Sequence, residues 1–172
     1  KGIEIMGNPI DLAVEMLKEG KIIALKGLGG FHLMCDATSE VAVAELRQRK
    51  YRKSKPLAVM FGSIEQLETY VAINDAEKKH ITGSIKPIVI VDAVRGTNLS
   101  SLIAPHIDRL GVFLPYTPLH RLLFEQIDFP LVATSANISD EPIMIRSSEI
   151  VGRLAHVVDA ILDHDRTIIN AL

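Results

Sequence analysis

The sequence of 172 residues contains one cysteine, no tryptophan, three tyrosines and five phenylalanines. A single cysteine excludes an internal disulfide and favours a reducing compartment, so we expect a cytoplasmic protein. Neither an H-E-x-x-H nor a C-x-x-C motif is present, which argues against the common zinc sites. The scarcity of aromatic side chains leaves few stacking platforms for single-stranded nucleic acid.

Long apolar runs are also missing. No run reaches the roughly 18–20 residues that a membrane span needs, and no signal-peptide pattern follows Lys1. The composition, 48% hydrophobic and 23% charged, is that of a globular protein, and the length suits one domain better than two. Because the first residue is not methionine, we expect residues 1–172 to be a single domain excised from a larger multidomain chain.

Basic residues do not outnumber acidic residues in the chain as a whole, but they are concentrated in one place. The net charge is −2, yet six of the 19 basic residues lie within positions 47–55 (RQRKYRKSK), and the rest of the chain carries a formal charge of −8. Cations at a helix end, favoured by the helix dipole, account for about two such residues. The remaining cations favour a compact anionic ligand. A double-stranded-RNA-binding module, which needs little more than basic residues in register, stays open as an alternative.

Helical and strand patterns alternate along the chain. Helices are predicted from Pro9 to Gly20, from 40 to about 50, after Ser63 and Asn74, from 118 to about 126, and over 147–155. Apolar segments at 21–26, 57–61, 88–91, 112–114, 131–134 and 157–162 predict strands. This interleaving predicts a single α/β domain built around one twisted, mixed sheet with flanking helices.

Two segments at predicted strand ends carry groups suited to an anion. In Lys26-Gly-Leu-Gly-Gly-Phe-His32, Gly29 and Gly30 would let backbone N–H groups approach a phosphate or carboxylate, with Lys26 and His32 on either side. The segment matches neither a dinucleotide fingerprint nor a Walker A loop. Thr134, Ser135 and Asn137 follow another strand, where hydroxyl and amide groups can reach phosphate oxygens or the water shell of Mg²⁺. An ordinary tight turn remains the alternative at each.

The basic segment itself is predicted to leave its helix near Lys50, because Pro56 disfavours helix for the residue before it. Arg52, Lys53 and Lys55 would then lie on a loop. Loop-borne cations can converge on a triphosphate, each contact contributing about 1.5–3 kcal/mol when partly desolvated.

Four motifs in order carry a resemblance that covers residues from about 11 to 169. They are KGLGGFHLMCDA (26–37), RKYRKSKPLAVM (49–60), GVFLPYTPLH (111–120) and LVATSANISDEPI (131–143). Together they resemble the YrdC-like family of adenylate-forming domains, and most nearly the YrdC-like domain of the carbamoyltransferases of [NiFe]-hydrogenase maturation (the HypF family). The resemblance implies a concave basic cleft that binds ATP with Mg²⁺.

The resemblance also implies roles for individual residues. Lys50, Arg52 and Lys55 would hold the ATP phosphates together with Thr134, Ser135 and Asn137. Lys26, Gly29, Gly30 and His32 would bind the substrate. Lys26, His32, Lys50 and Arg52 would take part in catalysis, with no protein-bound metal.

The implied reaction forms carbamoyl-AMP from ATP and carbamate. An acylphosphatase-like domain of the same chain would release carbamate from carbamoyl phosphate, and another domain would pass the carbamoyl group to the C-terminal cysteine of an acceptor protein. Threonylcarbamoyl-AMP synthesis for tRNA modification is the alternative. Those synthases resemble T-[ED]-T-x-Y-G-L where this chain has KGLGGFH, and they tend to carry Arg at the position of Phe113. Both departures favour carbamate over threonine.

Overall fold

The computed structural model describes residues 3–138 and 141–169, so positions 139 and 140 of the fourth motif lie outside it. The described residues form six helices and eight strands. The helices are α1 (Pro9–Lys18), α2 (Glu40–Arg49), α3 (Ile64–Glu68), α4 (Asp75–Thr82), α5 (Pro118–Phe124) and α6 (Ser147–Arg153). The strands are β1 (Ile23–Lys26), β2 (Phe31–Asp36), β3 (Ala58–Met60), β4 (Val71–Ala72), β5 (Val89–Ala93), β6 (Arg109–Phe113), β7 (Leu131–Ser135) and β8 (Ala160–Leu162).

Every predicted helix is present; the capping box predicted from Asn74 is formed, whereas in α3 the Ser63 side chain caps the helix but Gln66 accepts from Gly62 N–H and closes no capping box. Asn8 caps α1 and Pro9 occupies its first turn, while the Ser39 side chain accepts from the backbone of α2. Asn74 and Glu77 form the reciprocal capping box of α4. Orphan N–H groups at these helix starts are therefore satisfied locally, which is why short sequence signals located them.

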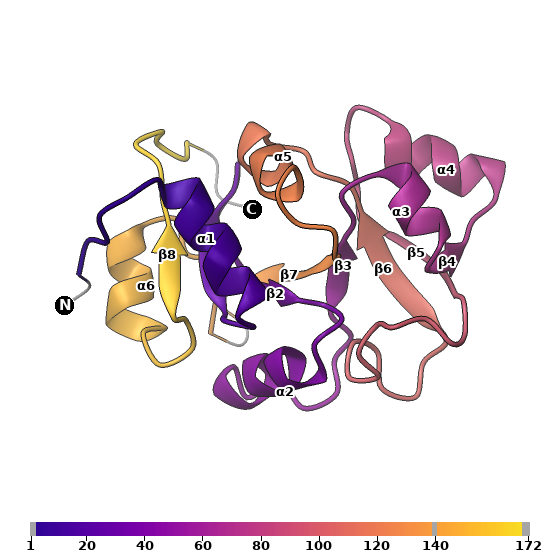
Figure 1. Ribbon diagram of the computed structural model, residues 1–172, viewed down its shortest axis with the longest axis horizontal. Coiled ribbons are helices and arrows are strands. Elements are labelled where there is room, and N and C mark those ends of the chain that lie inside the picture. Colours follow the sequence, from indigo (N-terminus) through magenta and orange to yellow (C-terminus); the bar gives the residue numbers. More distant parts are fainter. Residues whose placement is uncertain (1–2, 139–140, 170–172) are drawn as a thin grey trace.

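All eight strands belong to one sheet in the order β4-β5-β6-β3-β7-β2-β1-β8. Strand β1 pairs parallel with β8, and β3 pairs parallel with β6, while the other five pairings are antiparallel. The prediction of a mixed sheet is confirmed. In Figure 1 the chain spreads along this sheet, with α3 and α4 beside β4 and β5 at one end and α6 beside β8 at the other.

Two strands were not predicted, and one of them is central. Strand β2 directly follows the glycine turn, pairs antiparallel with β1 and β7, and aligns His32 with Ser135 of β7. The glycine segment is therefore a hairpin turn between two sheet strands. Strand β4 has only two residues, which is too short for a periodicity signal.

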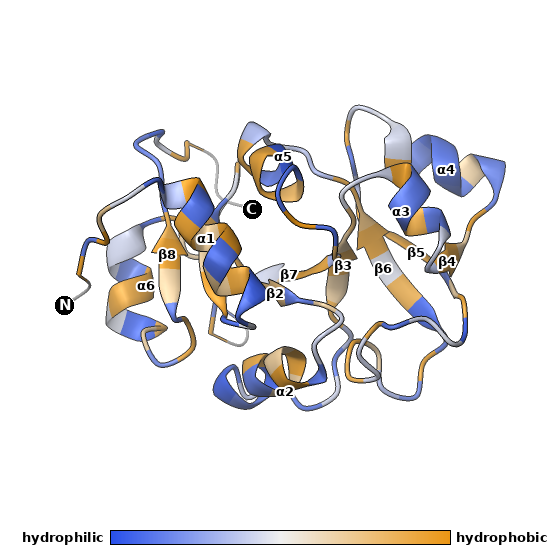
Figure 2. Cartoon of the chain, in the orientation of Figure 1, coloured by the Kyte–Doolittle hydropathy of each residue, from blue (hydrophilic) through white to orange (hydrophobic). Residues whose placement is uncertain are grey.

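Apolar side chains cover both faces of the sheet. On one face α1 and α5 pack against side chains that include Leu25, Met34 and Leu131. On the other face α2 and α6 pack against a larger cluster that includes Leu33, Cys35 and Val132. Figure 2 shows the same division, since α2 turns its apolar residues toward the sheet and α4, at the periphery, is mostly hydrophilic. Helices on both faces leave the strand ends and their connecting loops as the place for a site.

Candidate functional site

A cavity of about 900 Å³ opens where the predicted segments meet. It is lined by the glycine turn, the end of the basic segment, the carboxyl end of β7 and the residues after β6. Seven of the ten residues predicted for the site line it, namely Gly29, His32, Arg52, Lys55, Thr134, Ser135 and Asn137. Segments separated by more than 100 residues in the sequence therefore share one enclosure, as the prediction required.

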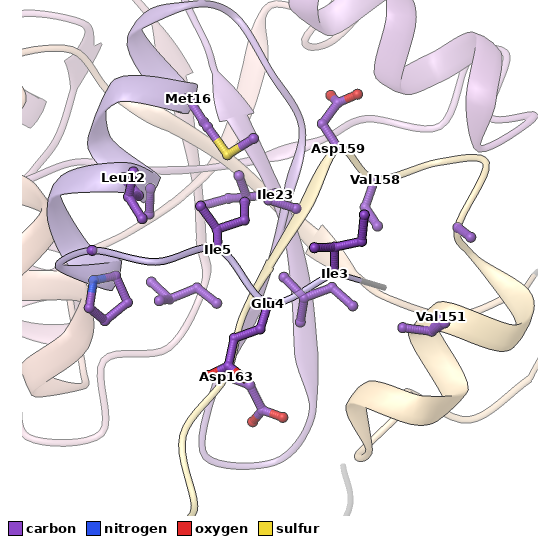
Figure 3. A pocket seen from close by; sticks show the side chains of 17 residues that line it. Ile3, Glu4, Ile5, Leu12, Met16, Ile23, Val151, Val158, Asp159 and Asp163 are labelled. Atoms are coloured by element: carbon purple, nitrogen blue, oxygen red, sulfur yellow. The ribbon is translucent and has the colours of Figure 1, made fainter. Parts of the chain in front are cut away.

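A second cavity, of about 660 Å³, lies beside α1, β8 and α6 and is less suited to an anion. Figure 3 shows Leu12, Met16 and Ile23 among the apolar side chains that line it. Its charged lining residues are all acidic: Glu4, Asp159 and Asp163. A polyphosphate would be repelled there, so the cavity beside the basic segment is the candidate site.

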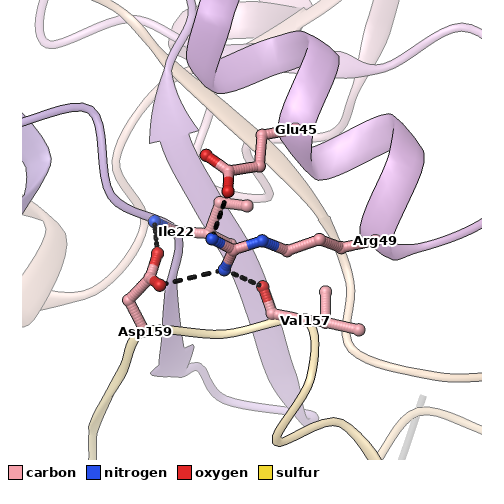
Figure 4. A network of polar contacts seen from close by, with 5 residues as sticks. All are labelled: Ile22, Glu45, Arg49, Val157 and Asp159. Carbon is pink, nitrogen blue, oxygen red and sulfur yellow. Dashed lines mark hydrogen bonds and ion pairs between the residues drawn. The ribbon is translucent and has the colours of Figure 1, made fainter.

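The six cations of the basic segment divide by role, and two of them stabilise the fold. Arg49 forms ion pairs with Glu45 and, at 2.9 Å, with Asp159, and it donates to the Val157 carbonyl oxygen (Figure 4). The Arg47 guanidinium is buried and donates only to backbone carbonyls among the described residues. These two side chains leave fewer free cations for an RNA backbone than the sequence indicates.

The chain leaves α2 through a tight turn at Tyr51. The Tyr51 N–H donates to the Gln48 carbonyl oxygen and the Arg52 N–H to that of Arg47, the pattern of a Schellman cap. Tyr51 takes the left-handed position, with φ of 53°, where glycine is usual. This conformation costs about 1–2 kcal/mol and directs Lys50 and Arg52, on either side of the turn, toward β7.

Lys50 and Arg52 both contact the carboxyl end of β7. The Lys50 ammonium donates to the Ser135 carbonyl oxygen and, at 3.0 Å, to Asn137 Oδ1. Arg52 Nη1 donates to Thr134 Oγ1 at 3.1 Å, and Lys55 lines the cavity next to it. Lys50 does not line the cavity itself, and its ammonium is held at the Ser135–Asn137 turn by these two residues.

The Ser135–Asn137 turn is internally braced. Ser135 Oγ donates to Asn137 Oδ1 at 2.8 Å, and Asn137 Nδ2 donates to the Glu141 carbonyl oxygen at 2.9 Å. Because Oδ1 also accepts from Lys50, the Asn137 amide links the basic segment to the turn. Hydroxyl and amide groups held in this way are preorganised to meet phosphate oxygens.

The glycine turn reaches the cavity only in part. Gly29 and His32 line the cavity, but Lys26 points elsewhere: its ammonium pairs with Asp163 at 3.0 Å and donates to the His164 carbonyl oxygen at 2.7 Å. Gly30 is not a lining residue either. A Cβ at Gly30 would lie 2.6 Å from the Ile143 side chain, so glycine permits the close packing of these two segments.

Several lining residues were missed by the sequence reasoning. Tyr116 follows β6 inside the GVFLPYTPLH motif, which contributed to the resemblance although Tyr116 received no role; Phe113, the last residue of β6, was singled out only as the position where the synthases tend to carry Arg. Ile85, Lys86 and Ile88 approach from the segment before β5, and nothing in their local sequence pointed to a site. The GVFLPYTPLH motif could have indicated that Tyr116 lies at the site. The approach of residues 85–88 to the cavity depends on tertiary structure alone.

Burial and charge lower the pKa of Lys50 to about 8, with desolvation the larger cause and the charges of Arg52 and Lys55 the smaller. We therefore expect ATP affinity to fall as the pH rises from 7 to 9.5. The loss should approach tenfold per pH unit above 8, because bound triphosphate favours protonated Lys50 and binding then takes up one proton. Calorimetric titration with MgATP in buffers of different ionisation enthalpy measures both the ATP affinity and the number of protons taken up on binding. In Lys50→Met the proton uptake should disappear, and its persistence would assign the titration to another group.

Groups of three or more histidine, cysteine, aspartate or glutamate side chains that could hold a metal ion do not occur in residues 3–138 and 141–169. Glu141 is the single carboxylate among the residues lining the cavity. None of the helices in these ranges is both long and apolar enough to cross a membrane.

Comparison with known proteins places the chain among enzymes. Residues 15–172 match the family described as Sua5_yciO_yrdC, telomere recombination. A carbamoyltransferase HypF of Rhodobacter capsulatus is 46% identical over 171 residues, which are 99% of this chain and 23% of that protein. A threonylcarbamoyl-AMP synthase of Escherichia coli is 32% identical over 143 residues, 80% of this chain and 75% of the synthase.

A solved structure of full-length HypF in its phosphate- and nucleotide-bound form has a TM-score of 0.94 and 42% identity, covering 99% of this chain and 23% of that one. The chain thus spans about a fifth of the HypF proteins that it matches. Both kinds of relative are transferases or synthases, and the fold and motif order agree with theirs. The chain is therefore a member of the Sua5/YciO/YrdC family, with high identity to the corresponding part of HypF carbamoyltransferases.

Proposed function

We propose that this chain forms carbamoyl-AMP from ATP and carbamate, as the adenylating domain of a carbamoyltransferase. One observation carries the proposal: Arg52, Lys55 and the Ser135–Asn137 turn meet Gly29 and His32 in a single cavity. The cations Arg52 and Lys55 suit a triphosphate, and the neutral groups at Gly29 and His32 in the same cavity suit a small acid. The HypF structure with the same fold was obtained in a phosphate- and nucleotide-bound form, which supports nucleotide use here.

The proposed reaction needs no proton transfer. A carboxylate oxygen of carbamate attacks the α-phosphorus of ATP, a new P–O bond forms, and the bond from the α-phosphorus to the pyrophosphate oxygen breaks. Negative charge grows on the leaving pyrophosphate, and Lys50, Arg52 and Lys55 would stabilise it without reorganising. Mg²⁺ would arrive with ATP and neutralise part of the phosphate charge, its ligands being phosphate oxygens and water more than protein carboxylates.

Carbamate fits the substrate end of the cavity better than threonine does. The lining there includes the apolar side chain of Phe113 at the position where the synthases tend to carry Arg, so a cationic partner for the carboxylate of an amino acid is missing. Threonylcarbamoyl-AMP synthesis remains the second candidate, since the Escherichia coli synthase covers most of this chain. Dependence on threonine separates the two.

The proposal extends to the larger protein. Carbamate would come from carbamoyl phosphate through an acylphosphatase-like domain, and the carbamoyl group would pass through another domain to an acceptor protein with a C-terminal cysteine in hydrogenase maturation. A cytoplasmic location belongs to the same proposal, since buried Cys35 is the only cysteine of the chain.

Exchange of labelled pyrophosphate into ATP tests the reaction with this chain alone. Ammonium bicarbonate supplies carbamate by its equilibrium in water, so no further domain is needed. Exchange should depend on ammonia and bicarbonate together and stay unchanged on adding threonine. Exchange that requires threonine would overturn the carbamate assignment in favour of the synthase reaction, and ATP binding without exchange under either condition would overturn adenylation.

A further inference from the structure

Three aromatic side chains, His32, Tyr116 and His120, form a cluster at the end of the cavity that we assign to the substrate. His32 and Tyr116 line the cavity, and the Tyr116 hydroxyl lies 3.3 Å from His32 Nδ1. His120 packs behind them, with its ring centroid 4.7 Å from that of Tyr116 at an interplanar angle of 77°. Tyr116 and His120 both belong to the GVFLPYTPLH motif, and the proposed function so far assigns neither of them a role.

We propose that Tyr116 is a positioning residue: its hydroxyl donates to His32 Nδ1 and keeps the proton on Nε2, which donates to the carboxylate of carbamate. This inference rests on the proposed function and adds to it the group that recognises the acid. Among the described residues, Nε2 of His32 has no hydrogen-bond partner, so it is available to a ligand.

The direction of the hydrogen bond follows from the chemistry of the two groups. A phenol is a good donor and a poor acceptor, whereas the unprotonated nitrogen of a neutral imidazole is a good acceptor. Burial lowers the pKa of His32 and raises the pKa of Tyr116 to about 12, so both groups are neutral near pH 7. With Nδ1 accepting, the remaining proton of the ring must be on Nε2.

The sheet register places this donor next to the nucleotide groups. His32 of β2 is aligned with Ser135 of β7, and side chains of directly paired residues lie about 4.5–5.5 Å apart at Cβ. Ser135 and Thr134 belong to the wall that we assign to the phosphates. An acid of four heavy atoms held at His32 would therefore reach the α-phosphorus without a long approach.

His120 fixes the back of the cluster. It is fully buried, and neither ring nitrogen has a hydrogen-bond partner within residues 3–138 and 141–169. Burial first, and then the neighbouring His32, lower the pKa of His120 to about 3, so it stays uncharged. The uncharged His120 ring packs against the Tyr116 ring without forming a hydrogen bond to the Tyr116 hydroxyl. His32 is therefore the hydrogen-bond partner of that hydroxyl.

Nitrogen NMR of histidine rings reads the tautomer directly, without any activity. With ¹⁵N-labelled histidine and His32→Gln to identify the signals, Nε2 of His32 should be protonated and Nδ1 should have the shift of a hydrogen-bonded acceptor. In Tyr116→Phe the Nδ1 signal should move to the position of an unbonded nitrogen, while Tyr70→Phe, remote from the cavity, should leave it unchanged. A proton on Nδ1, or a signal unaffected by Tyr116→Phe, would overturn the inference.

A double-mutant cycle tests the consequence for carbamate. In the exchange assay Tyr116→Phe should raise the KM for carbamate about tenfold, with the Kd for ATP unchanged, as expected for about 1.4 kcal/mol. His32→Gln retains an N–H near the position of Nε2, so adding Tyr116→Phe to it should have little effect. Equal effects of Tyr116→Phe in both backgrounds would show that it does not act through His32. Absence of exchange in the wild-type chain would refute the proposed function, and the NMR result would still decide the tautomer.

Discussion

Replacing Lys50 and Arg52 together by methionine should slow carbamate-dependent pyrophosphate exchange by about 10²–10⁴-fold. A direct contact from Arg52, which lines the cavity, contributes about 1.5–3 kcal/mol when its partner is charged and partly desolvated, and Lys50 adds its positive charge from the adjoining Ser135–Asn137 turn. Lys50 also donates to the Ser135 carbonyl oxygen and to Asn137, so its loss frees the turn that forms part of the same wall. Initial exchange rates and the Kd for MgATP measure the two consequences.

Lys53→Met is the matched control for this experiment. Lys53 directly follows Arg52 in the sequence but is exposed and does not line the cavity. The Lys53→Met variant removes one positive charge from the same segment. It should change the exchange rate by less than about threefold, as expected for a screened surface charge. If the double variant exchanged pyrophosphate as fast as Lys53→Met, the basic segment would not be the phosphate site.

The sequence was sufficient to predict the helices, the mixed sheet and the position of most site residues. Helix starts were found because caps such as Ser39 and Asn74 act within three residues of themselves. The site segments were found because glycines, hydroxyls and cations at strand ends are local patterns. What the sequence could not provide is the partner of each side chain.

Lys26 and the two arginines show this limit. Lys26 was expected at the substrate, but its partners, Asp163 and His164, come from residues about 137 positions away, and no pattern around Lys26 indicates them. Arg47 and Arg49 could not be distinguished from Lys50 and Arg52 for the same reason. Strand β2 was overlooked although a tight turn was kept as an alternative for the glycine segment, because the apolar residues after that turn were not interpreted as a second strand.

Arg47 carries the second large expected effect, on stability. It is 7% exposed, and its guanidinium donates to four backbone carbonyl oxygens at 2.7–3.3 Å. The acceptors lie on two loops: Arg52 and Lys55 in the basic segment, and Leu102 and Ile103 beyond β5. One planar side chain thus holds the basic segment against the body of the domain, which the single ammonium of lysine cannot do.

Arg47→Met should therefore lower the free energy of unfolding by about 3–5 kcal/mol, because it keeps the aliphatic volume but leaves buried carbonyls without donors. Arg49, whose side chain is 24% exposed, offers a comparison: Arg49→Met should cost about 1 kcal/mol, since ion pairs open to solvent contribute little. Urea unfolding gives both values. ATP affinity should fall in Arg47→Met even at low urea, where the chain is folded, because Arg52 and Lys55 lose their backbone anchor. Equal stability of the two variants would mean that the buried guanidinium does not anchor the loop.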